Sequence, residues 1–571
     1  MLKRRLIFSA LAALIISGFP SNILAAGLRG GFFGAANPVL LVPASADVYV
    51  ELNRAGTLGD NLKALVQTYQ SHPGTAAAVN GLTQVLGPEA LQQFNTLLKA
   101  APARVGVFAT IPFNSSTQPR VAIIAQLQPG SILNGGNPLS GLATFSPSTS
   151  YQGVSIYRVS FTNGLGSGYG AVVSGDGVIA GDVASIRSVI DAATFHTPSL
   201  SNDTDFNTTL GQIARLQRSG TESNTLTLYV ARHFLTQATR AAMQGAPTTG
   251  ATGAATQAAL RALQRSYAVG ITAYPNGISI VSSNLPQTTP LSANPNNGAG
   301  VVGNTALVYT SLFDLAGLLR SSGVFAGNTL SQAKAQTGID IANDVLPLIS
   351  REVVVDINDE TSPLIGLGLA ASSSNSALGS IPQLPGSLEL ATEVSDQTSA
   401  QASVNRIVAA LTKAAGGAAA SGSLFQQVTL PDGSAGYTIS VLPSFGYTFR
   451  NAGGHTFLVL STNLQEDVRA AKAVPLAADT DYTGAVGSLT AASPHGIAPF
   501  SSVNYTSIAR LLAAADKLLA YPQIKRAVGA STITAYQQQI KPLIAPFRNV
   551  IAVSRIAGPT DAQSQTFITV R

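Results

Sequence analysis

The tetrapeptide DTDF, Asp203 to Phe206, recurs 276 residues later as DTDY, Asp479 to Tyr482. Two carboxylates one residue apart, seen twice, would fit either a pair of metal sites or one structural unit written twice. A calcium loop of this type needs Gly at its sixth position and Glu at its twelfth, where the first copy has Thr208 and Ala214. We therefore interpret the first aspartate of each motif as a helix cap and the aromatic residue as a core side chain.

The sequence around these motifs also repeats. The segment LVPASADVYVELN, Leu41 to Asn53, has a counterpart in GNTALVYTSLFDL, Gly303 to Leu315, and both alternate like strands. Tyr229 and Tyr505, in later strand-like segments, are again 276 residues apart. The parallel predicts the order β-α-α-β-β-β-β-β-α-β-α-β-β twice.

Helices grouped between runs of antiparallel strands indicate the α+β class. We expect two tandem copies of an antiparallel-sheet unit with helices packed on one face. The predicted divisions are a signal peptide (1–26), a first repeat (38–284), a linker rich in Pro, Asn and Gly (285–300) and a second repeat (301–571).

Three further residues are predicted to cap helices. Asp182 and Asp314 each precede an apolar helical pattern, and Asn463 is followed three residues later by Glu466, which together would form a capping box.

The N-terminus has the layout of a secretory signal peptide. Basic residues at 3–5 precede an apolar run at 6–18, and small residues follow at 25–27. The run is shorter than the roughly 20 residues that span a bilayer, so we expect cleavage near Ala26, with an uncleaved anchor as the alternative. The mature chain is expected to be exported, periplasmic or extracellular and associated with the cell envelope, without a transmembrane helix.

Composition excludes several classes of protein. The formal net charge is +6, which is too small for a nucleic-acid footprint on a chain of 571 residues. There is no cysteine, which excludes thiol nucleophiles and cysteine-ligated metals. Charged residues make up only 11% of the chain and hydrophobic residues 45%, which suits a large core under a weakly charged surface.

Motifs that resemble catalytic or cofactor signatures lack their required context. Gly166, Gly168 and Ala171 match a dinucleotide-loop spacing, but a strand-like segment follows instead of a helix. SQAK, Ser331 to Lys334, matches a serine-lysine motif without its companion motifs. We interpret the first as a hairpin loop and the second as a helix surface.

The remaining polar candidates are weak as well. No two of the five histidines, at positions 72, 196, 233, 455 and 495, lie within one helical turn. DINDE, Asp356 to Glu360, is interpreted as a solvated turn at a strand end, with a weak cation site as the alternative. We therefore assign no catalytic, cofactor-binding or metal-binding residue, and no cofactor.

The chain resembles the bacterial domain-of-unknown-function family 3352 (DUF3352). The resemblance rests on LVPASADVYVELN, on TGIDIANDVLPLISREVVVDIN, on LATEVSDQTSAQASVNRIVAALTKA and on DTDY followed by the strand with Tyr505. It departs from the family pattern at GSILNGGNPLSGLATF in the first copy. The resemblance implies an exported or envelope-attached protein and transfers no active site.

These observations predict a non-enzymatic exported protein of the cell envelope, acting as a binding or structural module. The alternative is a carrier of lipid or another apolar ligand, held in a groove between helices and sheet. The expected partner is an unknown envelope component or an apolar ligand, and not nucleic acid.

Overall fold

The protein is described by a computed structural model. It covers residues 37–53, 57–72, 75, 104–112, 119–126, 143–161, 167–216, 224–243, 265–283, 294–321, 329–362, 384–414, 425–439, 442–492, 502–556 and 562–570. The predicted signal peptide and the first part of the predicted linker, residues 285–293, lie outside these ranges.

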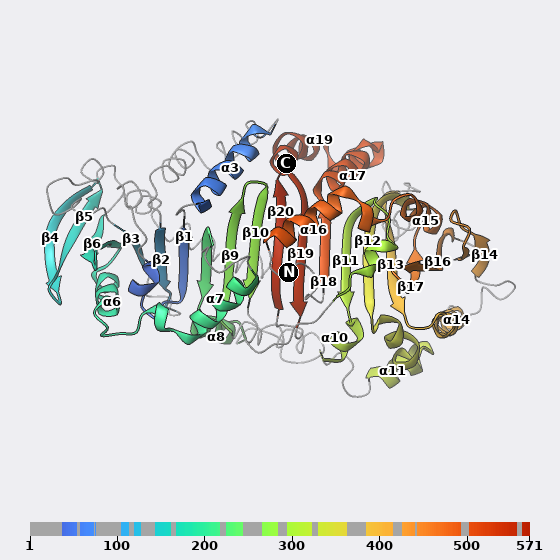
Figure 1. Ribbon diagram of the computed structural model, residues 1–571, viewed down its shortest axis with the longest axis horizontal. Coiled ribbons are helices and arrows are strands. Elements are labelled where there is room, and N and C mark those ends of the chain that lie inside the picture. Colours follow the sequence, from blue (N-terminus) through green and yellow to red (C-terminus); the bar gives the residue numbers. More distant parts are fainter. Residues whose placement is uncertain are drawn as a thin grey trace. The chain divides into compact units, whose positions relative to one another are not determined.

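The described chain forms two compact units, the first containing most of β1 to β10 and the second β11 to β20 (Figure 1). The elements of the first are η1 (Pro38–Leu41), β1 (Val48–Asn53), α3 (Thr57–Ser71), β2 (Arg104–Thr110), β3 (Arg120–Gln126), β4 (Ala143–Tyr151), β5 (Val154–Phe161), β6 (Ser167–Val173), β7 (Asp176–Ala180), α6 (Val183–Ala193), η2 (Leu200–Asn202), α7 (Thr204–Leu216), β8 (Leu226–Val230), α8 (Arg232–Met243), β9 (Tyr267–Tyr274) and β10 (Gly277–Ser283).

The second unit has a similar succession of elements with more helices. They are η3 (Asn297–Gly300), β11 (Ala306–Phe313), α10 (Leu315–Ser321), α11 (Thr329–Thr337), η4 (Ile341–Val345), η5 (Leu346–Ile349), β12 (Glu352–Ser362), β13 (Leu384–Val394), α14 (Gln397–Ala414), β14 (Phe425–Thr429), β15 (Ala435–Ile439), β16 (Leu442–Ala452), β17 (His455–Ser461), α15 (Leu464–Ala473), η6 (Leu476–Ala478), α16 (Thr480–Ala492), β18 (Ser502–Ser507), α17 (Ile508–Ala520), α18 (Pro522–Val528), α19 (Ala530–Ala535), η7 (Tyr536–Ile540), α20 (Lys541–Ile544), β19 (Phe547–Ile556) and β20 (Ala562–Val570).

The twenty strands of the described residues belong to one antiparallel sheet, so the predicted fold of two tandem units with helices on one face is wrong. The prediction from the sequence failed for a physical reason. Alternation of apolar and polar residues identifies a strand, but it does not say which strand pairs with it. Every open antiparallel sheet ends in strands with unpaired N–H and C=O groups, and these are available for further pairing.

Tyrosines define one face of the sheet in the second unit. Tyr309 in β11 and Tyr505 in β18 are directly opposite each other. Tyr482 from α16 lies on both, with ring centroids 5.9 Å and 5.1 Å away in edge-on geometry. All three rings are buried. We call the face that carries Tyr309 and Tyr505 the tyrosine face of this unit.

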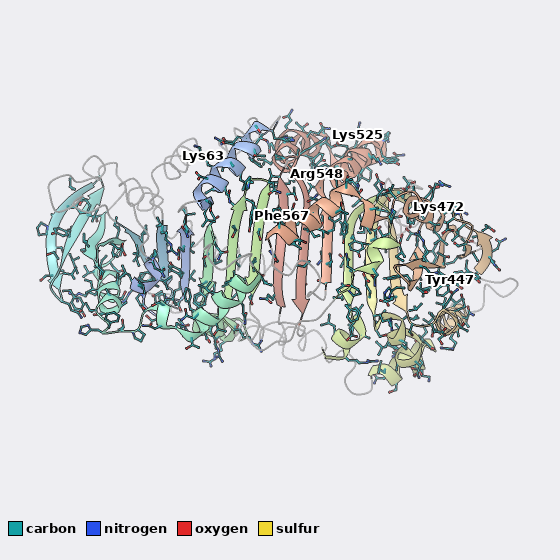
Figure 2. The ribbon with its side chains drawn as sticks, viewed as in Figure 1. Lys63, Tyr447, Lys472, Lys525, Arg548 and Phe567 are labelled. Atoms are coloured by element: carbon teal, nitrogen blue, oxygen red, sulfur yellow. The ribbon has the colours of Figure 1, made fainter. Side chains whose placement is uncertain are left out.

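Helices also cover the opposite face, which corrects the expectation that they pack on one face. Tyr309 is opposite Asp356, and Asp356 is opposite Glu389, so all three share the tyrosine face. Because side chains alternate along a strand, Val394 points to the other side. There it packs against Val404 of α14. Tyr447 belongs to the same cluster, and Figure 2 shows it on β16 beside α14.

Local capping interactions begin two helices as predicted. Asp182 Oδ1 accepts a hydrogen bond from Ser185 N at 2.8 Å at the start of α6. Asp314 Oδ1 accepts one from Gly317 N, also at 2.8 Å, at the start of α10. The predicted capping box at Asn463 is wrong. The Asn463 side chain donates to Thr361 O on β12 at 2.8 Å and does not cap α15.

An irregular strand lies at an edge. Within the described residues, β4 pairs only with β5, and its register shifts between Pro147 and Thr149. Much of β4 is exposed. Proline and a bulge are typical devices of edge strands, because both interrupt the row of free hydrogen-bonding groups.

Candidate functional site

The first DTD motif begins α7. Asp203 Oδ1 accepts a hydrogen bond from Phe206 N at 2.7 Å. The Phe206 ring packs edge-on against Tyr49 and Tyr229, with centroids 6.1 Å and 4.9 Å away. The aspartate therefore satisfies a free N–H group at the helix start, and the aromatic residue anchors the helix to the sheet. Both roles agree with the sequence interpretation.

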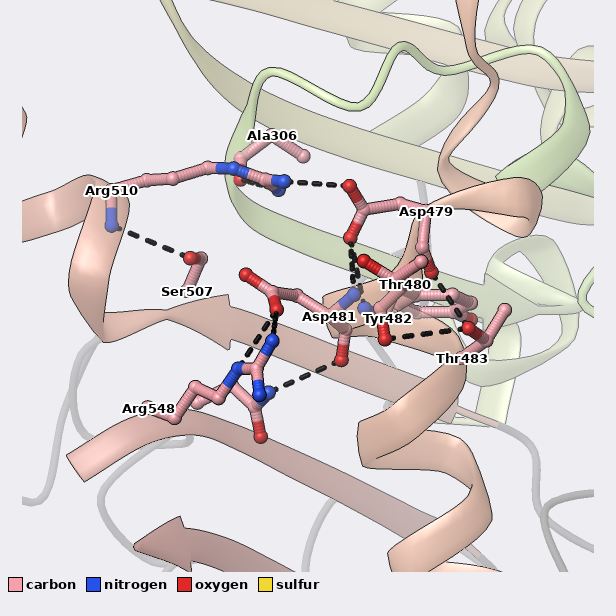
Figure 3. Close-up of polar contacts among 10 residues, drawn as sticks. Ala306, Asp479, Thr480, Asp481, Tyr482, Thr483, Ser507, Arg510 and Arg548 are labelled. Atoms are coloured by element: carbon pink, nitrogen blue, oxygen red, sulfur yellow. Dashed lines mark hydrogen bonds and ion pairs between the residues drawn. The ribbon is translucent and has the colours of Figure 1, made fainter. Parts of the chain in front are cut away.

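The second motif repeats this arrangement at α16 (Figure 3). Asp479 Oδ1 accepts hydrogen bonds from the backbone N–H groups of Asp481 and Tyr482, both at 2.9 Å. Its other oxygen, Oδ2, pairs with Arg510 at 2.6 Å. Asp481 pairs with Arg548, whose Nε lies 2.8 Å from Asp481 Oδ1. Every carboxylate of this motif is thus occupied by a structural partner.

The segments before the two motifs also have matching backbone contacts. Leu200 N donates to Val42 O at 2.6 Å, and Leu476 N donates to Val302 O at 2.8 Å. The same local arrangement therefore recurs 276 residues along the chain, even though the strands form a single sheet. In both copies, the first aspartate of the motif stabilises the start of a helix.

The serine-lysine motif lies on a helix surface as predicted, whereas the hairpin-loop interpretation is wrong for the described residues of the glycine-rich motif. Gly168 and Ala171 lie in strand β6, and Gly166 lies outside the described residues. Ser331 and Lys334 lie in α11, and Lys334 Nζ pairs with Asp340 Oδ2 at 2.7 Å. The described part of the glycine-rich motif continues as a strand, not as the helix that a dinucleotide loop requires.

The described histidines are dispersed and bind separate partners. His233 Nε2 lies 2.9 Å from Asp47 Oδ1, and this hydrogen bond raises the pKa of His233. His455 Nδ1 lies 2.9 Å from Glu393 Oε1, which also pairs with Arg351 at 2.8 Å. Within the described part of the chain, no group of three or more His, Asp or Glu residues is arranged to hold a metal ion.

The DINDE segment differs from its interpretation as a solvated turn, which is wrong. Strand β12 continues through it to Ser362, and Asp356 is fully buried (0% exposed). The sequence signal was the polar alternation at 352, 356 and 358, which marks one face of a strand. It was missed because polar alternation is ordinarily the solvent-facing side of an antiparallel sheet.

Asp356 belongs to a buried set of acidic side chains on the tyrosine face. Its opposite neighbour Glu389 is 1% exposed, and Asp467 from α15 is 2% exposed. Burial raises the pKa of Asp356 and of Glu389 well above the ordinary values, and the charge of Asp467 raises both further. Sequence reasoning did not bring these three residues together, because they come from three elements.

A cavity of about 820 Å³ with a mixed polar and apolar lining lies between α11, η4 and α14. Its charged residues are paired within the protein. Lys334 pairs with Asp340, and Arg406 Nε pairs with Asp344 Oδ1 at 2.6 Å. Asn343 donates from Nδ2 to Asp340 Oδ2 at 3.0 Å. The apolar part of the lining comes from the small side chains of Ala335, Ala409 and Ala410, so the cavity offers no large apolar side chain to an acyl chain.

The face of the sheet opposite the tyrosine face carries exposed apolar side chains in the second unit. Val355 is 40% exposed, Ile357 38% and Leu388 43%. Ile357 and Leu388 are directly opposite each other on β12 and β13. We call Val355, Ile357 and Leu388 the apolar stripe. Neighbouring exposed apolar residues mark a binding surface more often than scattered ones do.

None of the helices in the described ranges combines the length and apolar character needed to cross a membrane.

Comparison with known proteins identifies no family for this chain. No family model matches it, and no curated protein does. Among solved structures, a crystal form of TP0453 ("Structure of crystal form IV of TP0453") matches 44% of this chain and 81% of that chain. The identity is 10% and the TM-score 0.21, so this likeness carries no argument about fold or function.

Proposed function

We propose that this chain is a non-enzymatic exported protein of the cell envelope that acts as a binding module. The observation that carries the proposal is the apolar stripe. Its three side chains are neighbours on adjacent strands and remain exposed, whereas scattered exposed apolar residues need no explanation. Its export is proposed from the N-terminal sequence, with its basic, apolar and small-residue regions.

The non-enzymatic part of the proposal is supported by how the polar residues are used. The motif aspartates cap helices, and the described histidines form separate contacts. Hydrolase activity that one Ser or His substitution abolishes would contradict it.

A photo-crosslinking amino acid at position 388 tests the binding surface in the envelope of an expressing bacterium. The matched control is position 195, because Phe195 is an exposed apolar residue (88%) outside the stripe. We expect a defined covalent adduct from position 388 and none from position 195. Equal adducts from both positions, or none from either, would remove the stripe as a binding surface.

The alternative function is a carrier of lipid or another apolar ligand. The same stripe favours it, because an acyl chain is also stabilised by apolar contact. Mass analysis of the adduct from position 388 distinguishes a protein partner from a lipid. Native mass spectrometry of the gently purified chain adds a second test, since a carrier should retain a lipid and a clean apo mass would count against it.

A further inference from the structure

Two acidic side chains face each other in the interior, and no described cation forms an ion pair with either of them. Asp356 and Glu389 are directly opposite each other on the antiparallel strands β12 and β13. Side chains in such a pair have Cβ atoms roughly 5 Å apart, and like charges there are destabilising. Neither carboxyl oxygen of Asp356 has a hydrogen-bond partner of normal geometry, and neither does Glu389 Oε1. The nearby Asn358 side chain offsets only part of the effect of burial on the pKa of Asp356.

The third acid, Asp467, has a different environment. Its Oδ1 accepts a hydrogen bond from Asn358 Nδ2 at 2.7 Å and lies 2.9 Å from Ser387 Oγ. Its Oδ2 accepts one from Ser461 Oγ. Hydrogen bonds of this kind favour the ionised form of a carboxyl group. Burial raises the pKa of Asp467 as well, but these three hydrogen bonds counteract the effect, so Asp467 is the best equipped of the three acids to carry a negative charge.

The two arginines near these acids form their hydrogen bonds and ion pairs with other residues. Arg450 from β16 donates to Val301 O at 2.5 Å, and Arg510 from α17 pairs with Asp479. Among the described residues, no ion pair joins either guanidinium to Asp356 or Glu389. Tyr309 from β11, Glu360 from β12 and Glu466 from α15 are further titratable groups beside the set, and none of them supplies a positive charge.

We propose that Asp356 and Glu389 are both protonated in the folded protein at neutral pH and form a pH-sensitive latch between β12 and β13. A buried carboxyl group that forms no ion pair keeps its proton, because burial penalises the charged form. Asp467 holds the charge of the set. When the pH rises far enough to remove the two protons, two adjacent buried charges repel and the pairing of β12 with β13 weakens. This proposal does not depend on the proposed binding function.

Difference infrared spectroscopy of the full chain at about pH 7 tests the protonation states. Substitution Asp356→Asn or Glu389→Gln should each remove the carbonyl absorption of one protonated carboxyl group. Asp467→Asn is the matched variant from the same set, and it should remove carboxylate absorption instead. Unchanged absorption of protonated carboxyl groups in Asp356→Asn and Glu389→Gln would overturn the proposal.

Stability against pH gives the second readout. Raised carboxyl pKa values mean that the folded state holds more protons than the unfolded chain, so this contribution to stability is present in acid and is lost as the pH rises. Between about pH 6 and about pH 9 the wild-type melting temperature should fall by several degrees more than that of Asp356→Asn/Glu389→Gln. Identical pH slopes would contradict the latch.

The wild-type chain alone keeps the proposal testable if the double variant does not fold. An alkaline infrared titration should then convert protonated carboxyl groups to carboxylates over the pH range in which the melting temperature falls. A divalent cation bound in stoichiometric amount in native mass spectra would overturn the proposal, because a cation would keep both carboxylates charged.

Discussion

At the scale of single residues, the repeated aspartates have a structural role that can be measured. Replacing Asp203 by Ala removes the acceptor for Phe206 N at the start of α7. We expect a loss of about 1 kcal/mol in the free energy of unfolding, as for other N-caps. Urea denaturation measures it. Asp205→Ala, two residues along in the same motif, is the control and should cost clearly less.

His233 makes a pH-dependent contribution to the free energy of unfolding, and the direction of its pKa shift gives the sign of that contribution. Its hydrogen bond to Asp47 raises its pKa, so the folded state binds the proton more tightly than the unfolded chain. This contribution is therefore fully present below about pH 6.5, the ordinary histidine value, and is lost as the pH rises through the raised pKa. We expect NMR titration of the His233 ring to show the raised pKa, and His233→Gln to remove this part of the pH dependence of unfolding.

At the scale of elements, two glycines differ in the space around them: one lies in a closely packed contact and the other on an open helix surface. A Cβ added at Gly298 in η3 would lie 2.2 Å from Val354 Cγ2 and 2.9 Å from Glu352 Oε1. Gly298→Ala should therefore displace η3 from β12 and lower stability by roughly 1–3 kcal/mol, the usual cost of overpacking. A Cβ at Gly484 in α16 meets no atom within 4 Å.

Gly484→Ala is accordingly the matched substitution, and it should change the free energy of unfolding in the opposite direction. It should raise the free energy of unfolding by up to about 1 kcal/mol, because alanine loses less conformational entropy in a helix. Thermal or urea unfolding of both variants provides the measurement. A stabilised Gly298→Ala would show that η3 is not packed as described.

Capping shows what could be predicted from local sequence. Asp182 and Asp314 accept hydrogen bonds from backbone N–H groups three residues further along the chain, so the local sequence contains both partners. Asn463 bonds to Thr361, which is 102 residues distant, and local spacing carries no information about that contact. The acidic set was missed for the same reason, because Asp356, Glu389 and Asp467 meet only through strand register and helix docking.

At the scale of the whole molecule, the sequence identified the strands and the recurrence but not the assembly of the sheet. Tyr49 and Tyr229 are directly opposite partners, and so are Tyr309 and Tyr505, so the recurrence in sequence corresponds to the same strand pairing in both halves. The choice of partner for the remaining strands depends on hydrogen bonds between edges. Those bonds use only backbone groups, which are the same in every residue except proline.

Hydrogen exchange should reveal how stability is distributed over the molecule. Strands β1 and β11 pair on both sides and carry buried tyrosines, so their amides should exchange slowly. Within the described residues, β4 and β14 pair on one side only, and their amides should exchange faster. Mass spectrometry of peptides from these strands measures the difference. Equal protection of β4 and β1 would contradict the topology.

The interruption of β4 at Pro147 has a consequence for how copies of this protein behave when concentrated. A proline presents no N–H to an approaching chain, and the neighbouring shift in register bends the strand away from a regular template. Without them, nine residues rich in serine and threonine could nucleate filaments from one molecule to the next. Pro147→Thr should therefore increase light scattering on prolonged incubation while leaving the melting temperature nearly unchanged.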